Sequence, residues 1–448
     1  MPISKTPAFN LKVVLRETGL AADTLRAWER RYGLPVPQRS PGGHRLYSQY
    51  DIETVKWLVA RQNEGLSISR AVELWKDELA KGRDPLTDVK SRPAVSLPSL
   101  PQPIFLPPET NIDAIRAHWL AACLNFNESG AEHALNQAFS MYPVETVCVD
   151  VLQRGMAELG MLWYEGKASV QQEHFASGLA MRRLDSLLAA APAPTRNKTI
   201  LVGCPPEEWH NFSALMLTLF LRRRGFNVIY LGANVPTSRF EETVAAVNAD
   251  LVLLAAHHLV SAATLRQTAL QLSARGARIV YGGRIFNIHA DLQGAIPGHF
   301  LGERLDVAIE TIERMLVDFL APTTVDAPSH EYIEALRGFI LKRPLVEAAI
   351  NQHFQIGEMP PEYLETANRY MGNNIVAALQ LGNIAYLESE VEWLIHMLKS
   401  HNQPADSVRV YLSYYSNALR EHLGEQGDIL VHWIESNSSS LGTRTDTP

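Results

Sequence analysis

The stretch TILVGCPPEEWHNFSALMLTLFLRRRG, residues 199–225, predicts a buried β-strand that leads through a short loop into a helix. TILVGC is a brief apolar run, and FSALMLTLFLRRRG has the length and spacing of a helix. The alternation continues downstream with the apolar runs VIYLGA (228–233), LVLLAA (251–256) and RIVYGG (278–283) and the helical stretches RFEETVAAVNA and ATLRQTALQLSARG. Strands that alternate with helices of about 10–15 residues predict parallel βαβ units and a doubly wound parallel sheet.

The remainder of the chain is organised around this sheet. At 448 residues the protein is too long for one ordinary hydrophobic core. The fold class we expect is a multidomain α and α/β protein. Its predicted parts are short helices with turns over 8–80, a linker rich in Pro and Ser over 81–108, a helical bundle over 109–192, the sheet domain over 198–322 and an all-helical domain over 330–436.

Composition predicts a folded, soluble, cytoplasmic protein. Hydrophobic residues make up 46% of the chain and charged residues 20%. No apolar run reaches the ~18 residues that a membrane helix needs, and the N-terminus lacks the apolar segment of a secretory signal. The three cysteines lack metal-type spacing, which suits a reducing compartment. We therefore expect no membrane partner.

Charge is unevenly spread along the chain. The net charge is −7, but residues 1–85 contain 14 Lys and Arg against 10 Asp and Glu. A basic N-terminal segment on an acidic body indicates that only this segment meets a polyanion.

The basic segment contains the most specific motif, TLRAWERRYGLPVPQRSPGGHRLYSQYDI (24–52). The preceding LKVVLRETGLAAD predicts a helix and a turn centred on Gly19, so that two helices form a helix-turn-helix. The second helix carries several arginines beside aromatic residues, and the segment after it reads as a short two-stranded wing. A helix in the major groove with a wing on the phosphates is a known way of docking on DNA.

Residues 8–76 resemble the MerR family of winged-helix transcription regulators. The resemblance implies a double-stranded DNA operator as partner, and a dimer on a palindromic site. Trp28 is expected in the core. The Pro-rich linker stands where many family members have a dimerising coiled coil, so we expect assembly to depend on the later domains. The DNA contacts that it implies are Thr24, Arg26 and Arg30 on the recognition helix and Arg45 and Tyr47 on the wing.

The loop after the first strand of the sheet is the candidate ligand site. In open α/β sheets, ligands bind beyond the carboxyl ends of the strands, where Glu208, His210 and Ser213 lie. A loop histidine offers one ring nitrogen to a metal when a carboxylate or carbonyl holds the other. No G-x-G-x-x-G fingerprint follows the strand, which disfavours a dinucleotide enzyme.

Glu208-x-His210-x-x-Ser213 resembles the signature of the cobalamin-binding Rossmann-like domain, which normally reads Asp/Glu-x-His-x-x-Gly. The resemblance implies that His210 is the ligand of the cobalt ion. Further residues that it implies for cofactor binding are His257, Leu259 and Ser261 after the third strand and Gly282 and Gly283 after the fourth. Two departures stand out, because Ser213 replaces a Gly and His257 replaces a Ser. The second change is expected to narrow the slot for the cofactor's nucleotide tail or to alter the ligand.

The helical bundle carries a third motif, Trp163 followed after nine intervening residues by Glu173-His174. It resembles the cobalamin-dependent photoreceptor regulators, the CarH, CarA and LitR group, which have a MerR-like winged helix-turn-helix head, a helical-bundle cap and a cobalamin-binding sheet in this order. The resemblance implies adenosylcobalamin as cofactor, with Trp163 over the adenosyl group, Glu173 accepting hydrogen bonds from the nucleoside and His174 at the cofactor edge. Tyr164 stands where well-matched members have a second histidine, so we expect no bis-histidine photoproduct.

The resemblance implies a light-sensitive repressor rather than an enzyme, in which the dark cofactor holds a homo-oligomer, dimer or tetramer, with several DNA-binding heads. Two alternatives stay open: a corrinoid methyl carrier or methyltransferase-type protein, and a regulator that has lost cobalamin and senses another ligand such as haem or bilin. The last helices are expected to serve oligomerisation or partner binding, and a second chromophore there is conceivable. Histidines in this region are His353, His396, His401, His422 and His432.

Overall fold

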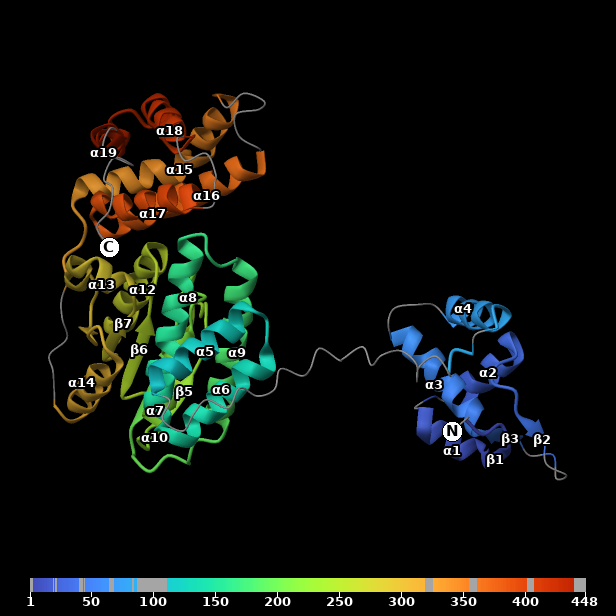
Figure 1. The fold of residues 1–448 in the computed structure, drawn as a ribbon. Coiled ribbons are helices and arrows are strands. Elements are labelled where there is room, and N and C mark those ends of the chain that lie inside the picture. Colours follow the sequence, from blue (N-terminus) through green and yellow to red (C-terminus); the bar gives the residue numbers. More distant parts are fainter. Residues whose placement is uncertain are drawn as a thin grey trace. The chain divides into compact units, whose positions relative to one another are not determined.

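Five parallel strands form the central sheet, in the order β5-β4-β6-β7-β8 (Figure 1). The first strand in the chain thus lies between the second and the third, which creates a topological switch point at β4. The doubly wound parallel sheet is confirmed. The last strand was not expected, because two residues are too few to show a periodic pattern. The strands are β4 (Thr199–Gly203), β5 (Asn227–Tyr230), β6 (Leu251–Ala255), β7 (Ile279–Gly282) and β8 (His299–Phe300).

This computed structural model describes residues 3–18, 20, 22–39, 43, 45–63, 68–82, 84–86, 111–318, 325–353, 361–400 and 407–438. The chain divides into two compact units, residues 1–104 and 105–448. Most of the expected linker (81–108) and the turn residues Gly19, Gly42 and His44 lie outside the described residues, as does His401.

Side chains alternate between the two faces of the sheet, as the pleat requires. Ile200 and Val202 belong to the hydrophobic core on one face, and Leu201 belongs to the core on the other. The first core includes α10 (Phe212–Arg223), α14 (Leu305–Val317) and the helical bundle, and the second includes α11 (Phe240–Ala246), α12 (Leu259–Ser273), α13 (Ile285–Ile288) and η3 (Ala290–Ala295).

The helical bundle, called the cap below, begins at Ile112 and ends at Ala189. Polar residues start its helices: Asn111 and Asn127 each accept a backbone N–H bond, and Ser169 forms a capping box with Gln172. Its elements are α5 (Ile112–Leu124), α6 (Glu128–Met141), α7 (Val144–Val147), the π-helix η2 (Cys148–Gln153), α8 (Arg154–Tyr164) and α9 (Val170–Ala189).

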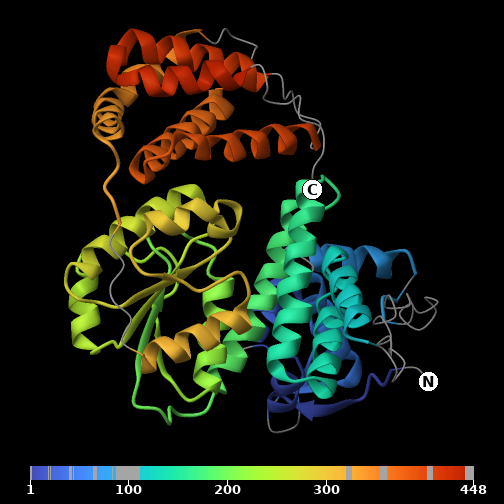
Figure 2. The same ribbon diagram turned by 90° about the vertical axis from the view of Figure 1, so that its left-hand side faces the viewer.

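The C-terminal helices do not stand apart from the sheet. Helices α12 and α16 pack together, and one continuous core runs from Val252 and Phe286 to Ile375 and Tyr415. Figure 2 shows these helices above the carboxyl edge of the sheet and the end of the cap. Their elements are α15 (His330–His353), α16 (Pro361–Leu381), η4 (Ile384–Tyr386), α17 (Leu387–Ser400), α18 (Ser407–Leu423), η5 (Gly424–Gly427) and α19 (Asp428–Ser438).

The N-terminal unit, called the head, is the expected helix-turn-helix with a wing. Trp28 is 5% exposed and lies in a core with Leu25 and Trp75, as predicted. The wing has one more strand than expected, because β1 pairs with β3 on the side away from β2. The elements of the head are β1 (Pro7–Asn10), α1 (Leu11–Thr18), α2 (Ala22–Tyr32), β2 (Gln38–Arg39), β3 (Arg45–Ser48), α3 (Gln49–Asn63) and α4 (Ile68–Ala80).

Among the described residues, no helix combines the length and the apolar character that crossing a bilayer demands.

Candidate functional site

The loop between β4 and α10, residues 204–211, is called the histidine loop. It leaves the sheet at the switch point, between the neighbouring strands β5 and β6. Asn234 fixes its course, since the Asn234 side-chain oxygen accepts the Glu207 N–H at 3.0 Å and the Asn234 N–H donates to the Glu208 carbonyl at 2.9 Å.

Glu208 is the buried centre of this loop, with no solvent exposure. Its Oε1 accepts the His210 backbone N–H at 2.7 Å and lies 3.0 Å from His210 Nδ1. Its Oε2 accepts the His257 N–H at 2.5 Å and the Ser261 hydroxyl at 2.7 Å. Burial alone would raise the pKa of Glu208, but the hydrogen bonds from His210 and from the Ser261 hydroxyl lower it to about 2. The carboxylate is therefore ionised and holds its neighbours in place.

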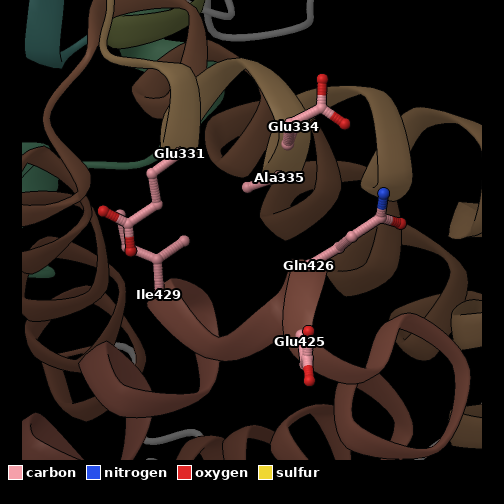
Figure 3. Close-up of a pocket in the computed structure, with 6 residues that line it drawn as sticks. All are labelled: Glu331, Glu334, Ala335, Glu425, Gln426 and Ile429. Atoms are coloured by element: carbon pink, nitrogen blue, oxygen red, sulfur yellow. The ribbon is translucent and has the colours of Figure 1, made fainter.

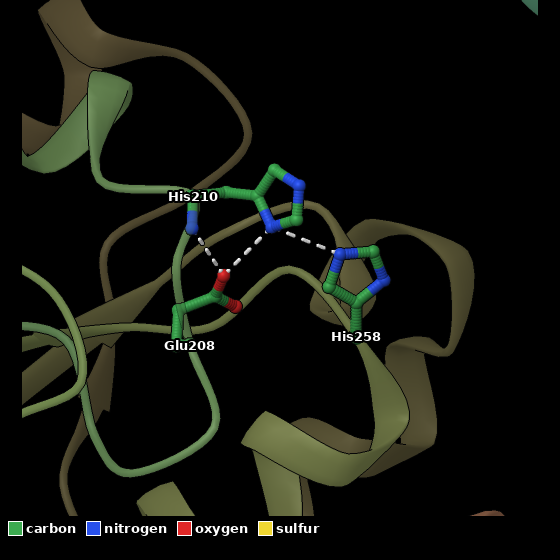
Figure 4. A group of neighbouring side chains, drawn as sticks. All are labelled: Glu208, His210 and His258. Carbon is green, nitrogen blue, oxygen red and sulfur yellow. Dashed lines mark hydrogen bonds and ion pairs between the residues drawn. The ribbon is translucent and has the colours of Figure 1, made fainter. Parts of the chain in front are cut away.

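His210 is presented to solvent by this carboxylate (Figure 4). The Nδ1–H donates to Glu208, which leaves the Nε2 lone pair free to bind a metal, and the His210 side chain is 64% exposed. The bond to Glu208 raises the pKa of His210, and the charge of Glu173 in the cap adds to this effect. The predicted cap residue Glu173 thus lies within electrostatic reach of the predicted metal ligand.

His258 is a neighbour that our sequence interpretation did not include in the site. Its Nε2 lies 3.0 Å from His210 Nδ1, and the two rings are 4.6 Å apart between centroids. Ligand atoms of Glu208, His210 and His258 lie within 4.8 Å of one another, a separation that one metal ion can bridge. The sequence did contain a signal for His258, because it lies just after a buried strand and next to His257.

The two residues that depart from the cobalamin signature contact each other. Ser213 Oγ lies 2.9 Å from His257 Nε2, and the Arg284 N–H donates to His257 Nδ1 at 3.4 Å. Since Nδ1 accepts, the Nε2–H donates to the serine. Burial lowers the pKa of His257 to about 4, so the ring is neutral. The pair connects the loops after β4 and β6.

Three of the predicted cofactor contacts turn out to have interior roles. Leu259 and Ser261 have no solvent exposure; the leucine belongs to the core, and the serine supports Glu208. A Cβ on Gly283 would collide with the carbonyl oxygen of Ala256, so this glycine lets β7 end close to β6. A Cβ on Gly282 would make only an ordinary van der Waals contact, at 3.9 Å from Leu301, so this position does not require a glycine for space.

The cap residues are partly exposed around the same edge. Trp163 lies at the end of α8, and Glu173 and His174 lie in the first turn of α9. His174 is 75% exposed and binds Glu173, with 2.7 Å between Nδ1 and Oε2. Tyr164 stacks on His396 of α17, a contact between the cap and the C-terminal helices that the sequence did not reveal.

The donor set fits a corrinoid. An imidazole with one nitrogen held by a buried carboxylate and the other facing outward is what a lower cobalt ligand requires. The contact between Ser213 and His257 lies close by, since the His257 ring is 6.2 Å from that of His210 between centroids. The predicted contacts of this group remain His210, Trp163, Glu173 and His174.

In the head, three predicted DNA contacts are exposed on the recognition helix α2: Thr24, Arg26 and Arg30. Arg45 is 38% exposed and donates to Glu29 at 3.0 Å. Tyr47 differs from the prediction. It is fully buried and donates its hydroxyl to Glu29 at 2.5 Å, so it fixes the wing to α2 instead of meeting a phosphate.

A separate cavity of about 210 Å³ lies among the C-terminal helices, lined by Glu331, Glu334, Ala335, Glu425, Gln426 and Ile429 (Figure 3). None of the described C-terminal histidines lines it.

Comparison with known proteins divides the chain into three matched regions. Residues 9–78 match a "MerR HTH family regulatory protein" model, and residues 115–188 and 198–305 match two "B12 binding domain" models. The chain is 30% identical over 299 residues to the HTH-type transcriptional repressor CarH of Myxococcus xanthus, which covers 66% of this chain and 95% of that protein.

A second relative is the HTH-type transcriptional repressor CarA of Myxococcus xanthus, 31% identical over 248 residues, which are 54% of this chain and 75% of CarA. Among solved structures, the monomethylamine corrinoid protein of Methanosarcina barkeri aligns at 17% identity and a TM-score of 0.41, over 46% of this chain and all of that protein.

Proposed function

The chain belongs to the family of CarH-like, B12-dependent MerR regulators, and on this premise we propose that it is a repressor whose DNA affinity is set by adenosylcobalamin and light. The MerR-type head binds DNA, and the two B12-binding domains bind a corrinoid. The adenosyl form, the light response, the cytoplasmic location and the lack of enzyme activity are parts of the proposal.

The arrangement of Glu208 and His210 carries this proposal. A buried, ionised carboxylate orients the ring, and the exposed Nε2 stands ready at the carboxyl edge of the sheet. A surface histidine without such a partner would lose side-chain entropy on binding a metal, whereas His210 is already ordered.

When bound, adenosylcobalamin supplies a cobalt–carbon bond that light can cleave. The residues of the chain bind and shield it. Trp163 excludes water from the upper side, Glu173 accepts hydrogen bonds from hydroxyl or amine groups of the nucleoside, and His174 lines the edge. Loss of the nucleoside removes the group against which these three side chains pack.

We further propose that the dark form is a homo-oligomer, a dimer or tetramer, whose linked heads bind one operator by avidity. Dissociation of the oligomer lowers the effective concentration of heads on DNA. Exposed Thr24, Arg26 and Arg30 on α2 are the proposed groove contacts, with Arg45 from the wing on the phosphates.

The test is to load the full-length protein with adenosylcobalamin in the dark, desalt it, and record its absorption spectrum and its elution from a sizing column before and after green light. We expect retained cofactor, a spectral change on illumination and a smaller species afterwards. The His210→Ala variant should lose the cofactor on desalting. His432→Ala, which removes an exposed imidazole from α19, is the matched control.

A colourless wild-type protein after desalting would refute cofactor binding. A coloured protein whose size and operator affinity ignore light would refute the light response and leave a corrinoid-binding regulator. Methyl transfer from the loaded protein to a thiol would favour the alternative of a methyl carrier.

A further inference from the structure

Helix α17 of the C-terminal region lies against the end of the cap, where the predicted upper wall of the cofactor site begins. The ring of Tyr164 stacks on His396, with 4.1 Å between centroids and 15° between planes. Trp393 contacts the same place, with its ring 6.1 Å from that of Trp163 and 6.3 Å from that of Tyr164.

The backbones of the two segments also meet. Ser400, the last residue of α17, donates its hydroxyl to the Tyr164 carbonyl at 2.6 Å. Gly166 faces the carbonyl of Ser400 so closely that a Cβ would overlap it. The cap and α17 therefore fit without a gap at this point.

The opposite end of α17 is anchored to the loops after β7. His289 Nε2 lies 2.9 Å from Ser389 Oγ, and the Tyr386 hydroxyl just before α17 donates to Asp291 at 2.7 Å. Arg284 lies within electrostatic reach of both His210 in the histidine loop and Tyr164 in the cap. The same charge acts on Glu390 of α17.

A cavity of about 560 Å³ lies beside this junction. Its wall on the cap side contains Trp163 and the segment from Gly166 to Gln171, and its wall on the C-terminal side contains Met397 and Leu398. Trp163 therefore borders the cavity on one side and contacts Trp393 of α17 on another.

We propose that α17 is the outer wall of the corrinoid site, and that Trp393 and His396 are positioning residues that hold Trp163 and Tyr164 against the cofactor's upper ligand. The inference rests on the proposed function and assigns a role to C-terminal residues that no matched family model covers. The C-terminal region then helps to select the upper ligand, which makes it part of the sensor.

The reason is mechanical. The Trp163 indole can favour a bulky nucleoside only if it stays in place when the nucleoside presses on it. The Trp393 ring of α17 restricts its movement on one side, and hydrogen bonds of Ser389 in α17 and of Tyr386 just before it tie the helix to the segment after β7. The lower ligand His210 does not depend on α17 in this way, so the two sides of the site respond differently to mutation.

The test measures the dissociation constants of adenosylcobalamin and hydroxocobalamin for the full chain in the dark. Hydroxocobalamin has no bulky upper group, so its affinity reports the lower side alone. Trp393→Ala and His396→Ala should reduce the preference for adenosylcobalamin by roughly two- to tenfold, the range that an aromatic pair supplies. His396→Phe, which retains a ring to stack on Tyr164, should restore the wild-type preference.

Tyr363→Ala is the control, since it removes an exposed aromatic ring from α16. Hydrogen exchange on the wild-type protein provides a measurement without mutation: residues 387–400 should be protected more strongly by adenosylcobalamin than by hydroxocobalamin. Equal protection, an unchanged preference, or a parallel loss of both affinities would overturn the proposal. Wild-type protein that binds neither corrinoid would overturn the proposed function as well.

Discussion

Glu208 shows how one buried side chain determines what its neighbours can do. It accepts hydrogen bonds from His210 in its own loop, from His257 in the loop after β6, and from Ser261 in the first turn of α12. Because both oxygens are used, the carboxylate fixes the relative position of the loops as well as the orientation of the His210 ring. We therefore expect the geometry of the site to depend on its charge.

Replacing Glu208 with Gln tests this dependence. The amide keeps the shape but turns one acceptor into a donor that faces N–H and O–H groups. We expect a loss of about 1–3 kcal/mol in the free energy of unfolding, the usual cost of unpaired buried groups, together with weaker corrinoid retention.

The matched control is Glu207→Gln, the same chemical change at the exposed neighbouring position. Chemical denaturation and desalting of the loaded protein measure the two effects. Equal behaviour of both variants would show that the charge of Glu208 has no structural role.

The contact between Ser213 and His257 leads to a second prediction. The double variant Ser213→Gly, His257→Ser restores the residues that the cobalamin signature normally has and removes the hydrogen bond that bridges the two loops. Binding of cobalamin should tighten by roughly two- to tenfold, as expected when a ligand no longer displaces one such bond.

Cobinamide, a corrinoid without the nucleotide tail, provides the control in a titration followed by absorbance. Its affinity should stay constant, because it places nothing in the slot. A parallel gain for both corrinoids would mean that the pair does not restrict the tail.

The sequence placed Glu208 and His210 on one loop at the carboxyl end of a strand, and in the structure the carboxylate holds the His210 ring. The role of His210 as a metal ligand stays a prediction. The sequence could not tell which way a hydroxyl points. Ser261 and Tyr47 were assigned to external ligands, and in the structure each donates to a buried glutamate, Glu208 or Glu29. Such roles depend on contacts between residues far apart in the sequence, which a local sequence pattern cannot predict.

At the scale of elements, one glutamate of the recognition helix joins it to the wing of the head. Glu29 on α2 accepts from Arg45 and Tyr47, which both belong to β3, and its side chain is only 10% exposed. This side chain therefore contributes to the orientation of the wing relative to the recognition helix, together with the packing of Tyr47 in the core of the head.

Glu29→Gln should lower the free energy of unfolding of the head by about 1–3 kcal/mol, because hydrogen bonds to a charged acceptor are among the stronger ones. Thermal unfolding followed by circular dichroism measures the change. Glu73→Gln is the control, since it breaks an exposed ion pair with Arg70 and should cost well under about 1 kcal/mol. Equal costs would contradict the assignment.

The start of the sheet gives a prediction on pH. Asp250 precedes β6 and accepts from Lys198 at 2.7 Å and from the Thr199 N–H at 2.8 Å, at the beginning of β4. Burial would raise the pKa of Asp250, but these hydrogen bonds outweigh it and lower the pKa below its usual value. A carboxyl group with a lowered pKa stabilises the fold above its unfolded-state pKa, and this stability is lost as pH falls through the folded-state pKa.

Asp250→Asn should therefore reduce the free energy of unfolding near neutral pH, by up to about 1 kcal/mol for such a partly exposed pair. The difference from wild type should be constant above about pH 5 and shrink below it, because the unfolded carboxyl titrates near 3.9. Urea denaturation at several pH values measures it. If the difference in the free energy of unfolding grew as the pH fell, the pKa of Asp250 would be raised in the folded state, and the prediction would be wrong.

Elements with a long periodic pattern were predictable, including the strands of the sheet except β8 and the helices of the cap. The partners of the C-terminal helices were not. An amphipathic pattern shows that a helix has a buried face, but it does not identify the surface that covers it. The packing of α16 on α12 and of α17 on the end of the cap follows from the whole chain.

At the scale of the molecule, the division into two units predicts how the protein unfolds. In the larger unit, one sheet contributes side chains to the core of the cap on one face and to the core of the C-terminal helices on the other, whereas the head has a core of its own. Calorimetry should show two transitions, one for residues 3–86 and one for residues 111–438.

Ligands should separate these transitions. Operator DNA should raise only the midpoint temperature of the transition that belongs to the head. A bound corrinoid should raise only the midpoint temperature of the transition that belongs to the larger unit. A third transition, belonging to the C-terminal helices, would show that their core is not continuous with that of the sheet.

The close approach at Gly166 has a consequence for engineering. The substitution Gly166→Ala adds one methyl group, which would overlap the Ser400 carbonyl and push the end of α17 away from the cap. This variant would separate the C-terminal helices from Trp163 while leaving every aromatic ring, His210 and the head unchanged. Corrugation of the contact surface by one carbon atom would thus be enough to isolate the C-terminal helices from the proposed cofactor site.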